Sequence, residues 1–356
     1  MTNNPEDFSV RTGTCNDIDL LVPGWRHKHS GHCESGVAAS MVSYHGMPLS
    51  EPLAFGLSSS LIFAHIPFLK IAGQPLTSYR VLPGQVLSTL QRRLACRMRY
   101  ARFRDPQSAQ KELNKLLEAG QPVGLQTSVF WLPYFPPEMR FHFNAHNLVV
   151  VGRYNNGDYL VSDPVFETEK RCDALSLENA RFARGAFAPR GKMYWLESVP
   201  SRVDWDRVIP KAIGHTVRMN YGFPLPFIGV RAIKVVVRKI LKMRLQCKDY
   251  RAHQLFVGHI IRMQEEIGTG GGGFRFMYAA FLQQAAEMLQ DEKLDQISKK
   301  MIDAGDQWRR FALAGAEFCR GRESSGLEVV ASELNNCADV EQEVYVALSG
   351  WLKGKC

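Results

Sequence analysis

Hydrophobic and polar positions divide the chain near residue 205 into two parts with different patterns. In the first part, the apolar runs 148–152 and 159–162 flank the segment 154–158, whose asparagines and glycine tolerate a positive φ. This pattern predicts a β-hairpin. Residues 193–196 predict a further strand, and leucines at helical spacing predict a helix over 110–118.

The strand pattern largely disappears after residue 205, and apolar residues recur there at helical spacing. Met277, Phe281 and Leu289, for example, fall on one stripe of a helix. We therefore expect an α+β fold, with a first domain over residues 10–205 and an all-helical C-terminal domain over 206–356. The helices predicted in this second part cover 230–251, 255–266, 274–290, 294–304, 307–320 and 340–353.

Composition and charge limit the class of protein. The hydrophobic fraction of 45% and the charged fraction of 22% are ordinary for globular proteins and exclude a disordered or fibrous chain. Eight cysteines are scattered singly, which favours neither a disulfide framework nor a zinc site of paired cysteines. The polar N-terminus is unlike a signal peptide, and the longest apolar run, 57–69, is too short and too polar to span a membrane. We expect a cytoplasmic protein, and its formal net charge of +9 suggests an acidic partner.

The segment 27–36, with the sequence HKHSGHCESG, is the most informative for chemistry. The spacing of Val37, Met41 and Tyr44 after it predicts a helix that begins at or just after Cys33. The N–H groups and the dipole at a helix N-terminus stabilise an anion, and the thiolate is the reactive form of cysteine. Cys33 is therefore a candidate nucleophile. The alternative is a buried, small apolar residue, which is how most free cysteines behave.

A histidine and an aspartate lie on the predicted hairpin. His146 precedes the first strand and Asp163 ends the second. A cysteine at a helix start, a histidine at a strand start and an aspartate on the next strand form the papain-type arrangement, in which the thiolate attacks, the imidazole moves the proton and the carboxylate orients the imidazole. We predict that Cys33, His146 and Asp163 form such a triad. The alternatives are a half-buried histidine at a strand edge and an aspartate of an ordinary strand exit.

The histidines before Cys33 have two possible roles. Papain-like enzymes stabilise the oxyanion with the backbone N–H of the nucleophile and with a side chain a few residues earlier, commonly glutamine. Here His27 takes the position six residues earlier, and His27 or His29 is the candidate donor. Zinc bound by His27, His29, His32 and Cys33 is the competing interpretation, although the spacing is no recognised zinc motif. We predict neither a metal nor another cofactor.

Short motifs cluster between residues 31 and 57: Gly-His-Cys-Glu-Ser at 31–35, Tyr-His-Gly at 44–46, Leu-Ser-Glu at 49–51 and Phe-Gly-Leu at 55–57. They resemble the N-terminal domain of the butirosin biosynthesis protein H family. The run 146–164 resembles the histidine and aspartate part of the same papain-like fold, which bacteriocin-processing cysteine peptidases share more loosely. The patch Gly-Gly-Phe-Arg at 272–275 resembles the helical domain that usually follows.

This resemblance implies an acyltransferase of secondary-metabolite biosynthesis rather than a protease. The namesake of the family takes an acyl group from the phosphopantetheine thioester of an acyl carrier protein and delivers it to an amine. By resemblance, Cys33 would accept the acyl group, His146 would act as base and acid, and Asp163 would orient His146. A small molecule with an amine or hydroxyl would be the acceptor. Two alternatives stay open: a cysteine peptidase, amidase or thioesterase with the same triad, and an inactive papain-like scaffold that binds a carrier protein.

Two apolar stretches, 61–69 and 129–137, are candidates to line an acyl channel, with Phe63 and Trp131 as representatives. Ordinary core packing is the alternative for both. The second stretch is rich in aromatic residues and proline, which suits a loop or lid better than a strand. Arg275 is a candidate ligand for a pantetheine phosphate, whereas the glycine run before it lacks the ending of a nucleotide-binding loop.

Basic residues cluster between 218 and 251, Arg238, Lys239 and Lys242 among them. Because carrier proteins are acidic around the pantetheine-bearing serine, this cluster is a candidate docking face, with a solvated helix face as the alternative. The sequence contains no motif for nucleic-acid binding. Contact with a membrane surface and a homodimer stay open.

Overall fold

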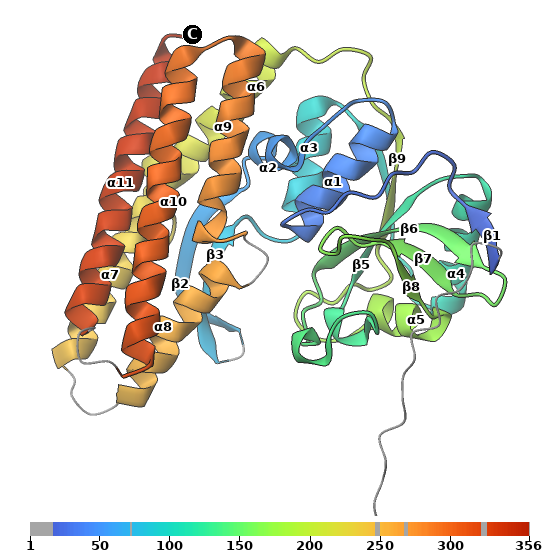
Figure 1. Ribbon diagram of the computed structural model, residues 1–356, viewed down its shortest axis with the longest axis horizontal. Helices are drawn as coiled ribbons and strands as arrows, with labels where there is room; N and C mark the ends of the chain where they lie inside the picture. Colours follow the sequence, from blue (N-terminus) through green and yellow to red (C-terminus); the bar gives the residue numbers. More distant parts are fainter. Residues whose placement is uncertain (1–16, 72, 246–249, 267–269, 322–325, 356) are drawn as a thin grey trace, which may run out of the picture. The chain divides into compact units, whose positions relative to one another are not determined.

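The computed structural model describes residues 17–71, 73–245, 250–266, 270–321 and 326–355 (Figure 1). Contacts group them into two units. Unit 1 contains residues 17–25, 100–163 and 168–195, and unit 2 contains 26–99, 164–167 and the described residues from 196 onward. The units therefore interleave along the chain. The predicted boundary between domains at 205/206 stays a prediction.

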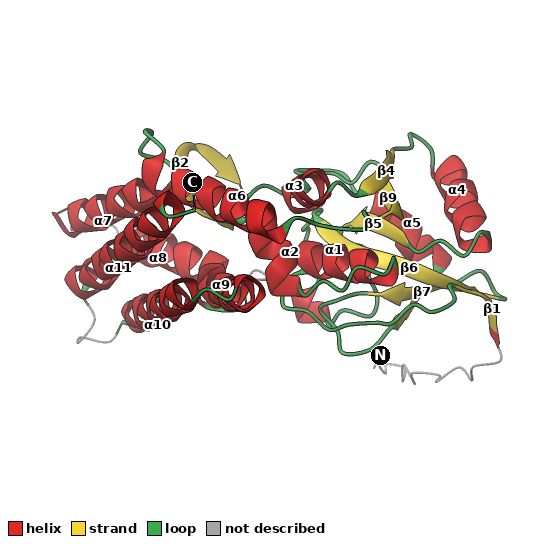
Figure 2. Ribbon diagram, turned by 90° about the horizontal axis from the view of Figure 1, so that it is seen from above, coloured by secondary structure: helices red, strands yellow, loops and turns green. Residues whose placement is uncertain are grey.

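An antiparallel sheet forms the frame of unit 1 (Figure 2). Its strands follow the order β9-β5-β6-β7-β8, and β1 pairs with β6. The helices α4 (Pro106–Glu118) and α5 (Ala174–Phe182) pack against strand β5. The predicted strand over 193–196 and the predicted helix over 110–118 are both confirmed. The strands are β1 (Ile18–Leu21), β5 (Val123–Thr127), β6 (His146–Tyr154), β7 (Tyr159–Ser162), β8 (Lys170–Cys172) and β9 (Met193–Ser198). Strand β4 (Arg97–Ala101) and strand β9 each contain residues of both units.

The predicted hairpin is strands β6 and β7. Its turn contains Gly157 with a φ of +89°, and the Tyr154 N–H donates to the Asp158 carbonyl at 2.8 Å. Val149 pairs with Ser162, which places Asp163 across from Leu148. Side chains two residues apart on a strand share a face, so His146 and Asp163 point to the same face of the sheet. The register, which the sequence left open, therefore brings the two residues together.

Unit 2 combines helices with a two-stranded sheet. Helices α9, α10 and α11 run side by side, and α7 packs on α11 (Figure 1). From residue 205 onward, the described residues contain helices and a single isolated bridge at Ile228, as the all-helical pattern predicted. The elements are α1 (Cys33–Tyr44), α2 (Glu51–Leu57), β2 (Leu61–Ile71), β3 (Gln74–Arg80), α3 (Gln85–Leu94), α6 (Trp205–Val217), α7 (Gly229–Leu245), α8 (Tyr250–Glu265), α9 (Arg275–Leu289), α10 (Glu292–Cys319) and α11 (Leu327–Lys353).

Three helix predictions need correction. The two helices predicted over 294–304 and 307–320 are one 28-residue helix, α10. Gly305 does not break this helix; it permits close packing, because a Cβ there would lie 2.7 Å from Phe276. Helix α11 begins at Leu327, well before the predicted residue 340. The helix predicted over 230–251 ends at Leu245; residues 246–249 lie outside the described part, and Tyr250 starts the next helix.

No helix in the described part of the chain is long and apolar enough to cross a membrane.

Candidate active site

Cys33 is the first residue of helix α1, as the sequence predicted, and its side chain is buried. The preceding residue, His32, caps the helix, because its Nδ1 accepts a hydrogen bond from the Ser35 N–H at 3.3 Å. In a helix, the first-turn N–H groups have no acceptor within the helix, and the dipole is positive at that end. Cys33 therefore lies beside backbone N–H groups that can donate to an anion.

The carboxylate of Glu51 organises the loop in front of Cys33. The N–H groups of Gly31 and His32 each donate to it at 2.8 Å, and the Ser35 hydroxyl donates at 3.0 Å. Burial raises the pKa of Glu51, while these hydrogen bonds act in the opposite direction. The motif Leu-Ser-Glu at 49–51 drew attention to this residue, but its contact with the loop depends on how α2 packs on α1.

The glycine-rich segment before α9 reaches the same loop within unit 2. The ring of Phe274 stacks on Phe55 at a centroid distance of 4.8 Å and meets the His32 ring edge-on at 5.2 Å. Phe274 has a φ of +70°, and its neighbour Gly273, with a φ of +56°, packs so closely on Tyr79 that a Cβ would lie 2.4 Å away. The patch at 272–275 thus packs against the cap of the helix that carries Cys33.

His146 and Asp163 form a buried hydrogen-bonded dyad in unit 1. The His146 Nε2 lies 2.7 Å from Asp163 Oδ2, and both side chains are almost fully buried. The Tyr134 hydroxyl donates to the same carboxylate oxygen at 2.8 Å, and the Phe135 ring meets the imidazole edge-on at 5.4 Å. Burial and the Asp163 carboxylate raise the pKa of Tyr134 well above its usual value, so its hydroxyl stays a donor. This geometry fixes the orientation of the imidazole.

Tyr134 is a residue that sequence reasoning missed as part of the site, because it lies in the aromatic stretch 129–137. That stretch contains the short 3₁₀ turn Val129–Trp131 and ends where a second turn, Pro137–Met139, begins, which fits the expected loop. Only the fold shows that the loop returns to the end of β7.

Replacing Tyr134 with phenylalanine is expected to lower the free energy of unfolding by about 2 kcal/mol, because a hydrogen bond to a charged group is worth about 1.5–3 kcal/mol. Tyr194→Phe is the matched control. The Tyr194 hydroxyl donates at 2.8 Å to the neutral Asn147 amide from the same sheet, and its loss should cost about 1 kcal/mol. Urea unfolding of both variants checks the order. A loss for Tyr134→Phe no larger than that for Tyr194→Phe would contradict this prediction.

The candidate oxyanion donors lie in unit 2. The His27 Nε2 is 2.9 Å from the carbonyl oxygen of Phe166, and His29 is exposed and lies near the Glu51 carboxylate, whose pKa it lowers. Within the described residues, no three His, Cys, Asp or Glu side chains are grouped so that they could hold a metal ion.

Phe63 and Arg275 are parts of the core of unit 2. Phe63 is fully buried against Tyr79 and Trp308, with centroid distances of 5.2 and 5.6 Å. Arg275 is fully buried as well and forms an ion pair with Glu341 at 2.6 Å. The burial of Phe63 fits the packing alternative, and the burial of Arg275 against Glu341 does not fit a ligand for a phosphate.

The remaining binding candidates lie at the surface of their units. Trp131 is partly exposed and packs edge-on against Phe130 in unit 1. On helix α7, Arg238 and Lys242 are exposed, while Lys239 is half-buried with its ammonium 3.8 Å from the centre of the Phe256 ring. Their role in binding a carrier protein stays a prediction.

The elements described above define the class of protein. A helix begins at a cysteine, a strand begins at a histidine, and an aspartate after the next strand holds that histidine. These are the parts of a papain-like cysteine enzyme, here in an α+β chain whose C-terminal part is helical.

Comparison with protein families identifies the chain more closely. Residues 32–164 match the family described as butirosin biosynthesis protein H, N-terminal, and residues 175–348 match a domain of unknown function, DUF4872. The match over residues 32–164 confirms the resemblance to the butirosin biosynthesis protein H family. No curated protein matches it significantly. Among solved structures, that of a C39-like peptidase candidate from Bacillus anthracis matches with 14% identity and a TM-score of 0.35, over 51% of this chain and 98% of that one.

Proposed function

We propose that this protein is a cysteine-dependent acyltransferase of a cytoplasmic biosynthetic pathway. Its donor is the phosphopantetheine thioester of an acyl carrier protein, its acceptor is a small molecule with an amine or hydroxyl, and Cys33, His146 and Asp163 are its triad. The observation that carries the proposal is the buried hydrogen bond between His146 and Asp163. It engages Nε2 of the imidazole, so Nδ1 is the nitrogen that we assign to the thiol of Cys33.

The covalent chain supports the pairing of Cys33 with the dyad. Asp163 and Pro164 share a peptide bond, and consecutive Cα atoms lie about 3.8 Å apart. The Pro164 carbonyl accepts a hydrogen bond from the Ser30 N–H at 2.6 Å, and a Cβ on Gly36 would lie 2.9 Å from the Pro164 ring. Because Ser30 and Gly36 lie on either side of Cys33 in the sequence, Pro164 packs beside the N-terminus of α1 within unit 2.

The reaction then has two balanced halves. In the first, the Cys33 thiolate attacks the thioester carbonyl, the bond between this carbon and the pantetheine sulfur breaks, and the imidazolium of His146 protonates the departing thiolate. In the second, His146 removes a proton from the acceptor, which attacks the acyl-cysteine and releases Cys33. Asp163 keeps the imidazole oriented and stabilises its charged form in both halves.

Donors for the oxyanion come from the same helix start in this proposal. The backbone N–H of Cys33 belongs to the first turn of α1, whose N–H groups have no intrahelical acceptor. His27 is the second donor that we assign. Its Nε2 lies within hydrogen-bonding distance of the Phe166 carbonyl, so the ring is held beside the residues that follow Asp163 and Pro164.

Incubation with acyl-loaded carrier protein, followed by intact-mass analysis, tests the proposal. We expect a mass increase equal to that of the acyl group, absent in Cys33→Ala. Cys96→Ala is the matched control, because burial raises the pKa of Cys96 to about 11 and keeps it a thiol, so the adduct should persist. Absence of an adduct with every acyl load, or an adduct that survives in Cys33→Ala, would refute the acyl-enzyme.

The fate of that adduct separates the transferase from its alternatives. Decay that requires an added amine or hydroxyl acceptor supports transfer, whereas decay in water alone at the same rate indicates a thioesterase. An adduct that forms from a peptide but not from an acyl-loaded carrier protein indicates a peptidase.

A further inference from the structure

Strand β2 of unit 2 contains a bulge that pushes two large apolar side chains outward. The pairing with β3 changes from Ile66 opposite Leu76 to Lys70 opposite Pro75, so four steps along β2 correspond to one along β3. The additional residues include Phe68, which is 76% exposed, and Leu69, which is 48% exposed. Bulges of this kind re-aim side chains and are retained where they serve a purpose.

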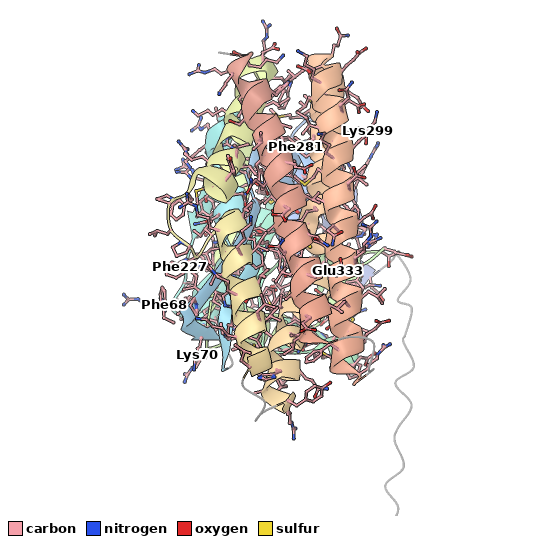
Figure 3. All side chains as sticks on the ribbon, turned by 90° about the vertical axis from the view of Figure 1, so that its left-hand side faces the viewer. Phe68, Lys70, Phe227, Phe281, Lys299 and Glu333 are labelled. Carbon is pink, nitrogen blue, oxygen red and sulfur yellow. The ribbon has the colours of Figure 1, made fainter. Side chains whose placement is uncertain are left out.

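The segment before helix α7 extends this apolar surface and holds the bulge in place. The Phe227 ring meets Phe68 edge-on at a centroid distance of 5.3 Å. The His65 N–H donates to the Phe227 carbonyl at 2.9 Å, and Ala64 forms a bridge with Ile228. Figure 3 shows Phe68 and Phe227 together on one side of unit 2, with Lys70 beside them. We call Phe68, Leu69 and Phe227 the apolar tip.

Positive charge flanks the apolar tip. Lys70 follows it directly, and Arg238 and Lys242 are exposed on α7; we call these three residues the basic flank. The sequence has no aspartate or glutamate over residues 61–80 or 218–248. Helix α7 packs on β2, and burial, together with the charge of Lys70, lowers the pKa of Lys239. A carboxylate does meet α7 elsewhere, where Asp339 pairs with Lys234 at 3.1 Å.

The apolar tip lies away from the nucleophile within unit 2. The near end of the hairpin, where Leu61 pairs with Arg80, touches α1, because Arg80 lies 3.4 Å from the Glu34 carboxylate. Phe68 is seven residues further along β2, which corresponds to roughly 20 Å at about 3.3 Å per residue. A partner at the apolar tip therefore does not occupy the site of Cys33.

We propose that the apolar tip and the basic flank dock the protein on a lipid membrane with anionic headgroups. Phe68 and Leu69 enter the boundary between headgroups and acyl chains, and the basic flank contacts lipid phosphates. Apolar residues that anchor protein partners fill pockets and are ringed by contacts that exclude water. The apolar tip instead protrudes from a bulge and is flanked by cations, which fits a lipid surface better than an acidic protein.

Sedimentation with vesicles tests the proposal. We expect the full-length protein to bind vesicles of phosphatidylcholine mixed with phosphatidylglycerol at least tenfold more tightly than vesicles of phosphatidylcholine alone, since each basic residue near an anionic surface contributes about fivefold. Phe68→Ser with Leu69→Ser should weaken binding at least tenfold, and Lys70→Gln with Lys242→Gln should remove most of the preference for phosphatidylglycerol. Leu313→Ser on α10, where the side chain is 64% exposed, is the control that should bind as the unchanged protein does.

Two results would overturn the proposal. One is equal binding of vesicles by the unchanged protein and by the double serine variant. The other is an absence of vesicle binding while the same variant loses affinity for an acyl carrier protein, which would assign the surface to an acidic protein. Formation of the Cys33 adduct in solution is measured without vesicles, so failure here leaves the proposed reaction unaffected.

Discussion

Replacing His146 with alanine is expected to slow the alkylation of Cys33 by iodoacetamide at neutral pH about thirtyfold. An ordinary cysteine is only a few per cent thiolate at this pH, whereas a cysteine paired with an imidazolium is almost fully ionised. The imidazole of His146 is held by Asp163 through Nε2, so a loss of this ring removes the partner that we assign to the thiolate. The rate is measured by mass spectrometry of the peptide that contains Cys33.

Controls for this experiment come from the same chain. Asp163→Asn keeps the shape but removes the charge, and we expect a smaller loss of rate. His65→Ala removes another buried histidine, whose Nδ1 lies 3.0 Å from the Thr77 hydroxyl and whose pKa burial lowers to about 4. This variant should leave the alkylation of Cys33 unchanged. An unchanged rate in His146→Ala would mean that Cys33 and the dyad do not act together, and it would favour the inactive scaffold.

Local patterns in the sequence were sufficient to predict the parts of the candidate site. Asn-Asn-Gly-Asp at 155–158 permits few structures other than a tight turn, and the apolar runs beside it required a strand on each side. The spacing of Val37 and Met41 likewise placed the start of α1 at Cys33. These predictions rest on interactions between residues close in sequence, for which side-chain period and turn chemistry are informative.

Features that depend on contacts distant in sequence could not be predicted. The apolar run 57–69 gave no sign that an 11-residue strand begins within it at Leu61 and continues to Ile71, because this strand, β2, depends on its pairing with β3 and its contact with α7. Glu51 became part of the loop before Cys33 only through the packing of α2 on α1. Arg275 was a candidate ligand for a pantetheine phosphate, and its burial could not be predicted because its partner, Glu341, is 66 residues away.

Replacing Arg275 with methionine should have the largest effect on stability, a loss of about 3–5 kcal/mol in the free energy of unfolding. The guanidinium of Arg275 contacts Glu341 at 2.6 Å, donates to the Gly273 carbonyl at 2.6 Å and lies 4.6 Å from the centre of the Trp308 ring. Both charged groups are fully buried. Removal of one partner from a buried ion pair leaves the other charge without compensation, which costs about 3–5 kcal/mol.

The double variant Arg275→Met, Glu341→Gln separates the cost of the orphaned charge from the loss of packing. The glutamine oxygen can still accept from the Trp308 indole, as Glu341 does at 2.5 Å, and no buried charge remains. We therefore expect it to recover about 1–3 kcal/mol of the loss, the range found for directly coupled residues.

Lys299→Met on the outer face of α10 (Figure 3) breaks an exposed pair with Asp295 and should cost no more than about 0.5 kcal/mol. Urea unfolding followed by far-ultraviolet circular dichroism reports mainly the helices of unit 2. A double variant less stable than Arg275→Met would show that the charge of Glu341 is compensated by its other partners, Trp308 and Tyr345.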